Sequence, residues 1–438
     1  MKTLSLLLAI LLSGCSSLPA VTQEHEALLN TGVSMEKVGD YQGAIAKFTQ
    51  VVASNPNYAR AYFERGRVKQ KSGDTQGALA DYTQAINLGY ETAKAYYNRG
   101  VAKGDLGDDT GALADYTQAL ALDPQFVFVY NNRGGVKERL GDRKGALADF
   151  NQAIALDPKY SNAYANRGAF KGRTGDLKGS IDDGTQAISL NPKNSEAYYN
   201  RALSKRDLGD NPGALADYTQ ALTLDPTKFD AYTGRASLEA KLRHHKAAID
   251  DWTAAIRIKP NNSSLYKARA AIRVQLGDYE GAIEDATQAI SIDPQYATAY
   301  MIRSWAKLQL GEPQEALSDA SRAIAIGPED DDREVAYLFR GLCRLQLGDH
   351  RGAYQDFSEQ LPYRSSDWWT SFLQGLAKMQ THDWQGANHD LSEAIGRMPN
   401  FAAAYFVRSK ARRELGDLQG ADEDLKKAIG LFQATMLA

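Results

Sequence analysis

The sequence predicts an all-α protein, a solenoid of about twelve helix–turn–helix repeats of 34 residues each. Two observations carry this prediction. Prolines recur every 34 residues over much of the chain, at positions 124, 158, 192, 226, 260, 294 and 328. Strings of similar residues recur in the same phase, such as AYYNRG at residues 95–100 and AYANRG at residues 163–168. A fixed period of this length is typical of stacked supersecondary units that share one continuous core.

Each repeat is predicted to contain helix A, a Gly-Asp turn, helix B and, in most repeats, a closing proline. Small residues in both helices allow close approach, and an aromatic residue such as Tyr116 fills the next gap. In a turn such as Gly107-Asp108, the glycine ends helix A and the aspartate caps helix B. Repeat five has Ser180 and Gly184 where other repeats have alanine and an aromatic residue, so we expect its joint to be the loosest.

Twelve repeats fit the chain in this phase. Repeats one to nine are predicted at residues 25–330 and repeats ten to twelve at residues 334–435, with an insertion at 331–333 and a tail at 436–438. Because one repeat cannot bury its own apolar face, we expect a continuous array and not separate domains.

The pattern resembles the tetratricopeptide repeat (TPR) family over residues 25–435. The resemblance implies a right-handed α-solenoid in which one stripe of helix A lines a groove that binds peptides or proteins. On a helical wheel, positions 2, 5, 6, 9, 12 and 13 of helix A share that stripe. They lie opposite positions 4, 8 and 11, where the residue types recur from repeat to repeat. The function implied is a non-enzymatic scaffold or adaptor for partner proteins. The alternatives are a peptide or cargo receptor and a scaffold that assembles with itself as a homodimer.

The composition is typical of a globular protein. Hydrophobic residues make up 43% and charged residues 24% of the 438 residues, which argues against a disordered or collagen-like chain. The 51 basic and 54 acidic residues give a net charge of −3, so we expect no nucleic-acid partner. Two cysteines, Cys15 and Cys343, argue against a disulfide scaffold.

The start of the chain predicts a lipid anchor. Lys2 precedes an apolar run at residues 4–12, which is too short to span a bilayer, and Ser13, Gly14 and Cys15 follow it. This arrangement resembles the signal peptide and lipobox of bacterial lipoproteins. The resemblance implies lipidation of Cys15 as the first residue of the mature chain, and acyl chains would then hold the protein at a membrane.

Residues 1–15 are therefore the expected signal segment, and residues 16–24 the expected polar tether. By resemblance to enterobacterial lipoproteins, Ser16 favours the outer membrane, with the protein facing the periplasm. The inner membrane and the cell surface are alternative locations. An ordinary signal with a chance cysteine, or a cytosolic chain with an apolar start, remain alternative interpretations of the segment.

Charged residues recur with the period and do not gather at one place. Aspartate recurs on helix B in eleven repeats, for example Asp81 and Asp115. Arginine precedes the small residue of helix A in ten repeats, at positions 65, 99, 133, 167, 201, 235, 269, 303, 340 and 408. We predict a ladder of Arg–Asp pairs that fixes the register of the helices, since removing one partner of a buried pair costs about 3–5 kcal/mol.

The sequence predicts no catalytic residue, no metal site and no cofactor. The six histidines have no metal-ligand spacing, and His244-His245 is placed at a turn. Residues 329–332 (EDDD) lack the glycine and alternating ligands of a calcium loop and are interpreted as a helix N-terminus. No phosphate-binding glycine loop or nucleophile elbow is present, and Cys343 is expected to be a buried helix residue.

Asparagine occupies the sixth position of helix A in repeats three to six, as Asn98, Asn132, Asn166 and Asn200. The stripe resembles the ladder inside the superhelix of O-GlcNAc transferase, where amides hold an extended peptide backbone. An amide offers both a donor and an acceptor, so it can bind backbone without reading side chains. The alternative is that asparagine is simply common at this position of the repeat.

In repeats nine to eleven the same stripe is apolar, and we predict it as a partner-binding surface. Its residues are Met301, Ile302, Trp305, Leu308, Leu338, Phe339, Leu342, Trp369, Phe372, Leu373 and Leu376. A large exposed apolar area usually marks an interaction site, and tryptophan is common in hot spots. The alternative is that these residues pack within the solenoid or against a second copy of it.

Overall fold

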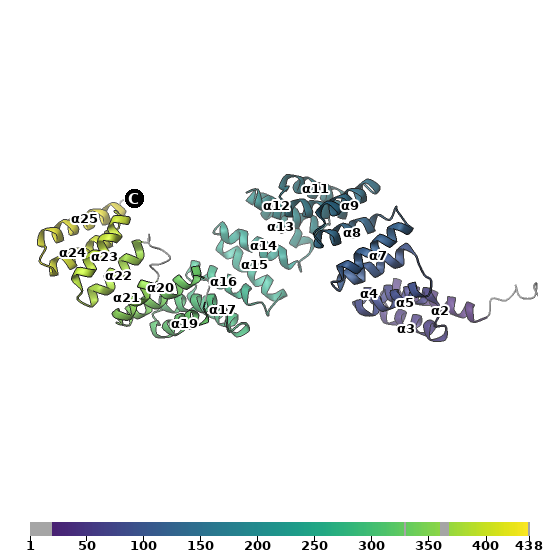
Figure 1. Cartoon of the computed structure of the whole chain (residues 1–438), viewed down its shortest axis with the longest axis horizontal. Helices are drawn as coiled ribbons and strands as arrows, with labels where there is room; N and C mark the ends of the chain where they lie inside the picture. The colour runs from purple at the N-terminus through teal and green to yellow at the C-terminus, as the bar shows by residue number, and fades with distance from the viewer. Residues whose placement is uncertain (1–19, 328–329, 360–367, 437–438) are drawn as a thin grey trace, which may run out of the picture. The chain divides into compact units, whose positions relative to one another are not determined.

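The computed structural model describes residues 20–327, 330–359 and 368–436. Over these ranges the chain forms 24 α-helices and no strand, which confirms the all-α prediction. The helices follow one another as twelve pairs, and each pair comprises helix A and helix B of one repeat (Figure 1).

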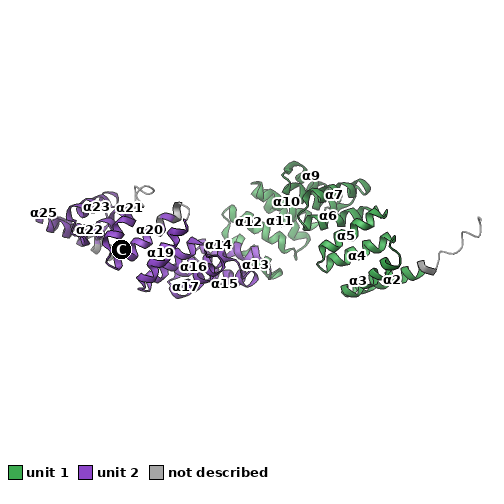
Figure 2. Ribbon diagram, turned by 60° about the horizontal axis from the view of Figure 1, so that its bottom comes forward, with its two compact units in different colours: residues 1–226 green, residues 227–438 purple. Residues whose placement is uncertain are grey.

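Residues 1–226 form the first compact unit, which contains repeats one to six (green in Figure 2). Each helix packs against its chain neighbours within this unit. The helices are α2 (Ala20–Lys37), α3 (Tyr41–Ser54), α4 (Ala59–Lys71), α5 (Thr75–Asn87), α6 (Ala93–Asp105), α7 (Asp109–Leu122), α8 (Val127–Arg139), α9 (Arg143–Leu156), α10 (Ser161–Arg173), α11 (Leu177–Leu190), α12 (Ser195–Asp207) and α13 (Asn211–Leu224).

Residues 227–438 form the second compact unit, which contains repeats seven to twelve (purple in Figure 2). Within this unit too, each helix packs against its chain neighbours. The helices are α14 (Phe229–Lys241), α15 (His245–Ile258), α16 (Ser263–Leu276), α17 (Tyr279–Ile292), α18 (Ala297–Gln309), α19 (Pro313–Ile326), α20 (Asp330–Gln346), α21 (His350–Glu359), α22 (Trp368–Gln380), α23 (Trp384–Arg397), α24 (Ala402–Glu414) and α25 (Leu418–Met436).

Glycine in helix A is explained by a ring from helix B. A Cβ atom on Gly100 would lie 2.7 Å from the ring of Tyr116, and one on Gly134 would lie 2.8 Å from the ring of Phe150. No larger residue fits there without movement of the ring. The rings themselves are almost fully buried, so the close approach of the two helices forms the core of each repeat.

The Gly-Asp turns have the predicted geometry. Gly107 adopts a φ of 84°, in the left-handed region that glycine enters without steric cost. Asp108 then caps α7 by accepting a hydrogen bond from the backbone N–H of Gly111 at 2.8 Å. The sequence assignment of the turn in repeat seven was displaced by one residue, because Arg243 takes the left-handed position with a φ of 62° and His244 is the uncapped N-cap.

The predicted Arg–Asp ladder is present in all ten repeats that carry the arginine. Arg99 illustrates it, because its Nε and Nη2 donate to the two oxygens of Asp115 at 2.8 and 2.7 Å. Lys103 adds a second cation 2.9 Å from the same carboxylate, which is only 4% exposed as a residue. A bidentate, buried pair of this kind fixes the relative position of helices A and B.

In at least six repeats the arginine also contacts the preceding repeat. Nη1 of Arg65 donates to Thr49, which lies 16 residues before it, whereas Asp81 lies 16 residues after it. Arg269 makes the same link to Thr253 at 2.8 Å. The guanidinium therefore ties helix A to the helix B of its own repeat and to the helix B of the repeat before.

Repeat five closes the gap left by its missing aromatic ring by a closer approach of its helices, and a looser joint there stays a prediction. A Cβ atom on Gly184 would lie 3.0 Å from the Cβ of Arg201 on the next helix A. Ser180 and Ser204 form a buried hydrogen bond between their hydroxyl groups at 2.7 Å. The small residues allow the backbones to approach, and the two hydroxyl groups satisfy each other.

Repeat ten differs from the others in the length of its helices. The three residues of the predicted insertion, 331–333, belong to the 17-residue helix α20, and α21 contains 10 residues. The link predicted at residues 363–367, and Pro362 before it, lie outside the described residues. The recurring 34-residue phase resumes at α22, which begins at the first residue of repeat eleven.

The predicted signal segment, residues 1–15 with Cys15, also lies outside the described residues. Of the predicted tether at residues 16–24, residues 20–24 belong to helix α2, and residues 16–19 lie outside the described residues. Across the part of the chain that the structure describes, none of the helices combines the length and apolarity needed to cross a membrane.

Candidate functional site

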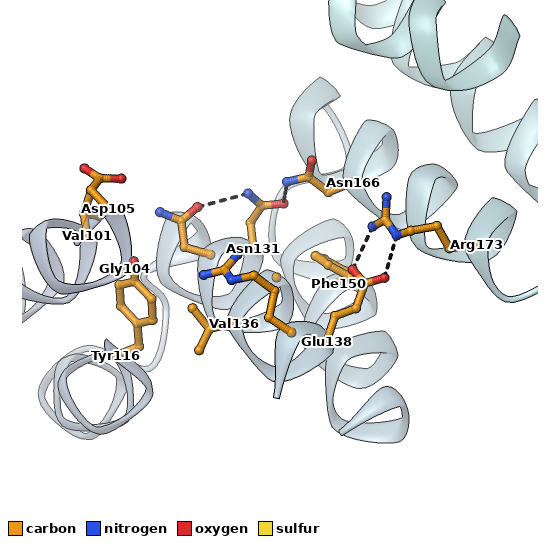
Figure 3. Close-up of a pocket in the computed structure, with 13 residues that line it drawn as sticks. Val101, Gly104, Asp105, Tyr116, Asn131, Val136, Glu138, Phe150, Asn166 and Arg173 are labelled. Atoms are coloured by element: carbon orange, nitrogen blue, oxygen red, sulfur yellow. Dashed lines mark hydrogen bonds and ion pairs between the residues drawn. The ribbon is translucent and has the colours of Figure 1, made fainter. Parts of the chain in front are cut away.

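A cavity of about 610 Å³ lies on one face of repeats three to five, within the first compact unit (Figure 3). Its walls come from helix A of these three repeats, α6, α8 and α10, and its floor includes Tyr116 of α7 and Phe150 of α9. Most wall residues occupy positions 5, 6, 9, 12 and 13 of helix A. This is the stripe that the helical wheel separates from the packed positions.

Two glycines keep this cavity open. A Cβ atom on Gly135 would meet only Nη1 of Arg139, at 3.9 Å, and one on Gly104 would meet nothing closer than 3.9 Å. Neither glycine is required by packing, in contrast to Gly134, whose Cβ would touch the Phe150 ring. The absence of side chains at Gly104 and Gly135 therefore leaves ligand-sized space over the helix surface.

An amide network crosses the cavity and joins the three repeats. Nδ2 of Asn166 donates to Oδ1 of Asn131 at 2.9 Å, and Nδ2 of Asn131 donates to Oδ1 of Asn132 at 3.2 Å (Figure 3). Nδ2 of Asn132 donates in turn to the hydroxyl of Tyr97 at 3.2 Å. All three hydrogen bonds run in the same direction, from Asn166 to Tyr97, and hydrogen bonds aligned in this way polarise one another.

Ion pairs border the cavity. Arg139 donates to both oxygens of Asp109, and this hydrogen bonding lowers the pKa of the Asp109 carboxyl. Nε and Nη2 of Arg173 each donate to one oxygen of Glu138 at 2.8 Å (Figure 3). The two arginine side chains are 55% and 59% exposed, so the pairs are accessible to solvent and to ligands. Asp105 on the rim has no ion-pair partner among the described residues.

A second cavity of about 220 Å³ lies on the same face, between α10 and α12. Arg173 lines both cavities, and the second also includes Gly172, Asn200 and Ser204. The two cavities are therefore neighbouring parts of one groove across repeats three to six. We call this surface the amide groove.

An aromatic row continues from the network toward the N-terminal ends of the helices. Its ring centroids are 5.1 Å apart for Tyr97 and Phe126, 6.2 Å for Phe126 and Phe128, and 5.1 Å for Phe128 and Tyr160. Phe128 is 49% exposed, which is high for so large an apolar side chain. On α8, Phe128, Asn132, Gly135 and Arg139 are spaced four, three and four residues apart, so all four lie on one stripe of the helix.

The four predicted asparagines do not form one uniform ladder. Asn132 and Asn166 line the larger cavity and are joined through Asn131, whereas Asn200 lines the smaller one and donates to Glu196 of its own helix at 3.3 Å. Asn98 is half-buried and lines neither cavity.

Sequence reasoning missed Asn131, Tyr97 and the two paired arginines, Arg139 and Arg173. One signal was available in the sequence. Helix A has glycine at position 9 or 12 in repeats three to five, where repeats nine to eleven have large apolar residues such as Trp305. A glycine inside a helix costs about 0.5–1 kcal/mol relative to alanine, so its recurrence on one stripe indicates a need for space.

The apolar stripe of repeats nine to eleven is largely packed on itself. Met301, Phe372 and Leu373 are at most 6% exposed, so they support this surface from inside. Trp305 stacks on Phe339 with ring centroids 5.0 Å apart and an angle of 25° between the ring planes. Leu338, Leu342 and Leu376 pack partly against one buried cluster, and Phe339 packs partly against another. Ile302 and Leu308 are half-buried, and Trp369 is 36% exposed.

Chemistry-bearing side chains do not gather at any described place. No group of three or more His, Cys, Asp or Glu residues in the described ranges is placed to hold a metal ion. Cys343 is fully buried, and burial raises the pKa of its thiol to about 11, so it remains protonated near neutral pH.

Comparison with known proteins gives consistent family matches. Three models of the tetratricopeptide repeat match the chain. One matches residues 93–126, and a second matches residues 59–88 and 129–160. The last matches residues 34–68, 199–263, 267–331 and 372–434. That last model covers just over half of the chain. Repeats five and ten, which depart most from the pattern, contribute little or nothing to the matched ranges. None of the curated proteins matches the chain.

Solved structures with similar folds are distant in sequence. A tetratricopeptide repeat protein from Parabacteroides merdae is 21% identical over 58% of this chain and 98% of its own, with a TM-score of 0.38. The hetero-tetramer Cut9–Hcn1 of APC/C matches at 17% identity over 93% of this chain and 87% of that one, with a TM-score of 0.38. YrrB, described as a TPR protein with an unusual peptide-binding site, is 22% identical over 42% of this chain and 95% of its own, with a TM-score of 0.34.

Proposed function

The chain belongs to the tetratricopeptide repeat family, and from that premise we propose that it is a non-enzymatic scaffold that binds partner proteins in the amide groove of repeats three to six. The single observation that carries this proposal is the cavity of about 610 Å³ held open by Gly104 and Gly135. Its polar groups come from three successive repeats, as expected for a site that accepts an extended segment lying across them.

The groove is built to recognise main chain more than charge. Each of its arginines is already paired with a carboxylate, and its centre is a network of amides, which both donate and accept hydrogen bonds. A partner segment would bind through its peptide groups and fill the space above the two glycines. The peptide or cargo receptor, given above as an alternative function, would therefore use this same groove to bind an extended segment of its partner.

Partner capture by the full chain and two matched variants tests this function. Gly135→Leu fills the groove, whereas Gly396→Leu changes an exposed glycine of α23 whose surroundings are also empty. We expect proteins from an extract of the native cells to be captured by the original chain and by Gly396→Leu, and to be lost with Gly135→Leu. Equal capture by all three chains would show that the groove is not the binding site.

We propose that Cys15 is lipidated and anchors the scaffold to the bacterial outer membrane, on its periplasmic side. The supporting observation is the order of basic residue, short apolar run and small residues before Cys15. Labelling cells with a fatty-acid analogue tests it, followed by separation of the two membranes. Cys15→Ala should lose the label and leave the membrane fraction, whereas Cys343→Ala, which changes a buried thiol, should keep both. A labelled Cys15→Ala chain contradicts the proposal, and label in the inner membrane contradicts only the location.

The exposed part of the apolar stripe is a second candidate surface, for a partner or for a second copy of the chain. The half-buried stack of Trp305 on Phe339 favours it, because stacked rings at a surface are good anchors. Charged residues at both positions distinguish the outcomes. An intact fold with lost partners or lost dimers in light scattering supports docking, whereas a large loss of stability shows that the stack serves only the solenoid.

A further inference from the structure

Unused hydrogen-bond donors outnumber unused acceptors around the larger cavity of the amide groove. Arg139 and Arg173 use Nε and Nη2 for their carboxylates, and Nη1 of each has no acceptor among the described residues. Asn131 and Asn166 each donate through only one of their two amide hydrogens, whereas Asn132 also makes a side-chain hydrogen bond to Tyr116.

Tyr97 adds one more donor at the end of the network. Its oxygen accepts from Asn132, so its hydrogen remains available, and burial raises the pKa of this hydroxyl and keeps it protonated near neutral pH. Around the larger cavity, the carboxylate and amide oxygens that accept no side-chain hydrogen bond are Oδ1 of Asn166 and the carboxylate of Asp105. The complementary ligand is therefore rich in acceptors and poor in donors.

The same ligand must be close to neutral and must offer apolar rings or faces. The arginines at the rim are paired with Asp109 and Glu138, so an anionic ligand would have to displace a carboxylate from either of them. Beside the network the exposed ring of Phe128, flanked edge-on by Phe126 and Tyr160, presents an aromatic face. A flat apolar group of the ligand can stack there.

A proline-rich segment has each of these properties. Proline has a carbonyl acceptor but no N–H donor, and a polyproline II helix makes no internal hydrogen bonds, so all its carbonyls remain free to accept. Its rings stack on aromatic side chains, and its conformation is largely formed before binding. We propose that the amide groove binds a proline-rich segment in the polyproline II conformation, with a proline ring on Phe128 and backbone carbonyls on the free donors of the groove.

The size of the groove fits a short segment. Helix A of repeat three and helix A of repeat five are separated by two helix–helix spacings of about 8–10 Å each. A polyproline II helix rises about 3.1 Å per residue, so about six residues cross this distance. The inference rests on the proposed function, because it names the kind of segment that the same groove accepts.

Binding of labelled synthetic probes to the full chain tests it. The probes are an oligoproline of about nine residues, a Gly-Ser peptide of the same length and a neutral linear oligosaccharide. We expect the oligoproline to bind about tenfold more tightly than either of the others. Phe128→Ala and Gly135→Leu should each weaken it by about fivefold or more, since one removes the stacking ring and the other fills the groove.

Matched variants outside the groove serve as controls. Phe406→Ala removes an aromatic residue that is 40% exposed on α24, and Gly396→Leu fills empty space on α23. Both should leave the binding of oligoproline unchanged. Oligoproline that binds no better than the Gly-Ser peptide, tighter binding of the oligosaccharide, or equal effects of groove and control variants would each overturn the inference.

The two proposals fail in different ways. If partner capture depends on Gly135 but oligoproline does not bind, the groove is a docking site for another class of segment and only the inference fails. If neither capture nor oligoproline binding depends on Gly135, the proposed function fails as well.

Discussion

Gly134 and Gly135 are consecutive residues of α8 that meet opposite surroundings. A Cβ atom on Gly134 would lie 2.8 Å from the ring of Phe150, whereas one on Gly135 would meet nothing closer than Nη1 of Arg139 at 3.9 Å. The first glycine is a requirement of the fold, and the second is a feature of the groove.

Alanine at these two positions should therefore have opposite effects. Gly135→Ala should raise the free energy of unfolding by about 0.5–1 kcal/mol, because alanine restricts the unfolded chain and favours the helix. Gly134→Ala should lower it by about 1–3 kcal/mol, because the new methyl group displaces the Phe150 ring. Urea unfolding followed by circular dichroism measures both. A stabilising Gly134→Ala would mean that the ring moves freely and that the packing explanation is wrong.

The buried carboxylates of the ladder should be expensive to remove. Asp115 holds Arg99 and Lys103, so Asp115→Asn leaves two cations with little compensation and should cost about 3–5 kcal/mol. Hydrogen exchange of α6 and α7 measures this locally, which is appropriate because long repeat arrays do not always unfold in one step. Asp422→Asn is the control, since Asp422 and Arg413 are 63% and 59% exposed and their pair should contribute less than about 0.5 kcal/mol. Similar losses in both variants would contradict a special role for burial.

Repeat eleven lacks the arginine, and its aspartate shows the consequence. Asp390 has Lys378 at 2.8 Å, and Gln374 stands where other repeats have arginine. Burial raises the pKa of Asp390, so between the unfolded and folded pKa values the folded state binds more protons and stability falls as the pH rises. Gln374→Arg should lower this pKa and stabilise the repeat by about 1–2 kcal/mol near neutral pH.

The pH dependence provides the check on this variant. Its advantage over the original chain should shrink as the pH falls through the raised pKa of Asp390, because a protonated Asp390 no longer attracts the new guanidinium. Thermal unfolding of the variant and the original chain, near neutral pH and at a pH at which Asp390 is protonated, measures the difference in stability. An advantage that is independent of pH would show that the arginine acts through packing alone.

The turn of repeat seven should be improved by a glycine. Arg243 adopts a φ of 62°, which costs a residue with a Cβ atom about 1–2 kcal/mol relative to glycine. Arg243→Gly should therefore raise the melting temperature, and the reverse change Gly209→Ala, at a φ of 86°, should lower it. No change in either variant would mean that neighbouring contacts absorb the strain.

The periodic features of the fold were predictable because each is a local rule repeated many times. The phase of the helices, the Gly-Asp turns and the Arg–Asp ladder all depend on residues within one repeat length, so one sequence shows them many times over. Repeat five was predicted less well, because whether Gly184 leaves a gap or allows closer approach depends on how far two backbones can move. Spacing alone carries no information on that movement.

The candidate site was predictable only in its position on helix A. Asn132 and Asn166 are on the predicted stripe, but their connection through Asn131 depends on side-chain conformations in two different repeats. The pairing of Arg173 with Glu138 also joins neighbouring repeats. The sequence offers several oppositely charged residues near each of them, so it does not identify the pair. Contacts between repeats are thus the part that a repeated local rule does not determine.

The arginine donates to an aspartate 16 residues after it and, in at least six repeats, to a hydroxyl or amide 16 residues before it, and this has a consequence for the history of the chain. Excision or duplication of a 34-residue block that keeps the phase brings an acceptor to the guanidinium at the new junction wherever the preceding helix B carries a hydroxyl or amide at that position. The array can therefore lengthen or shorten by whole modules without an intermediate that is poorly joined. Recombination between these repeats can move a binding groove along the chain while the arginine contacts between neighbouring repeats are kept.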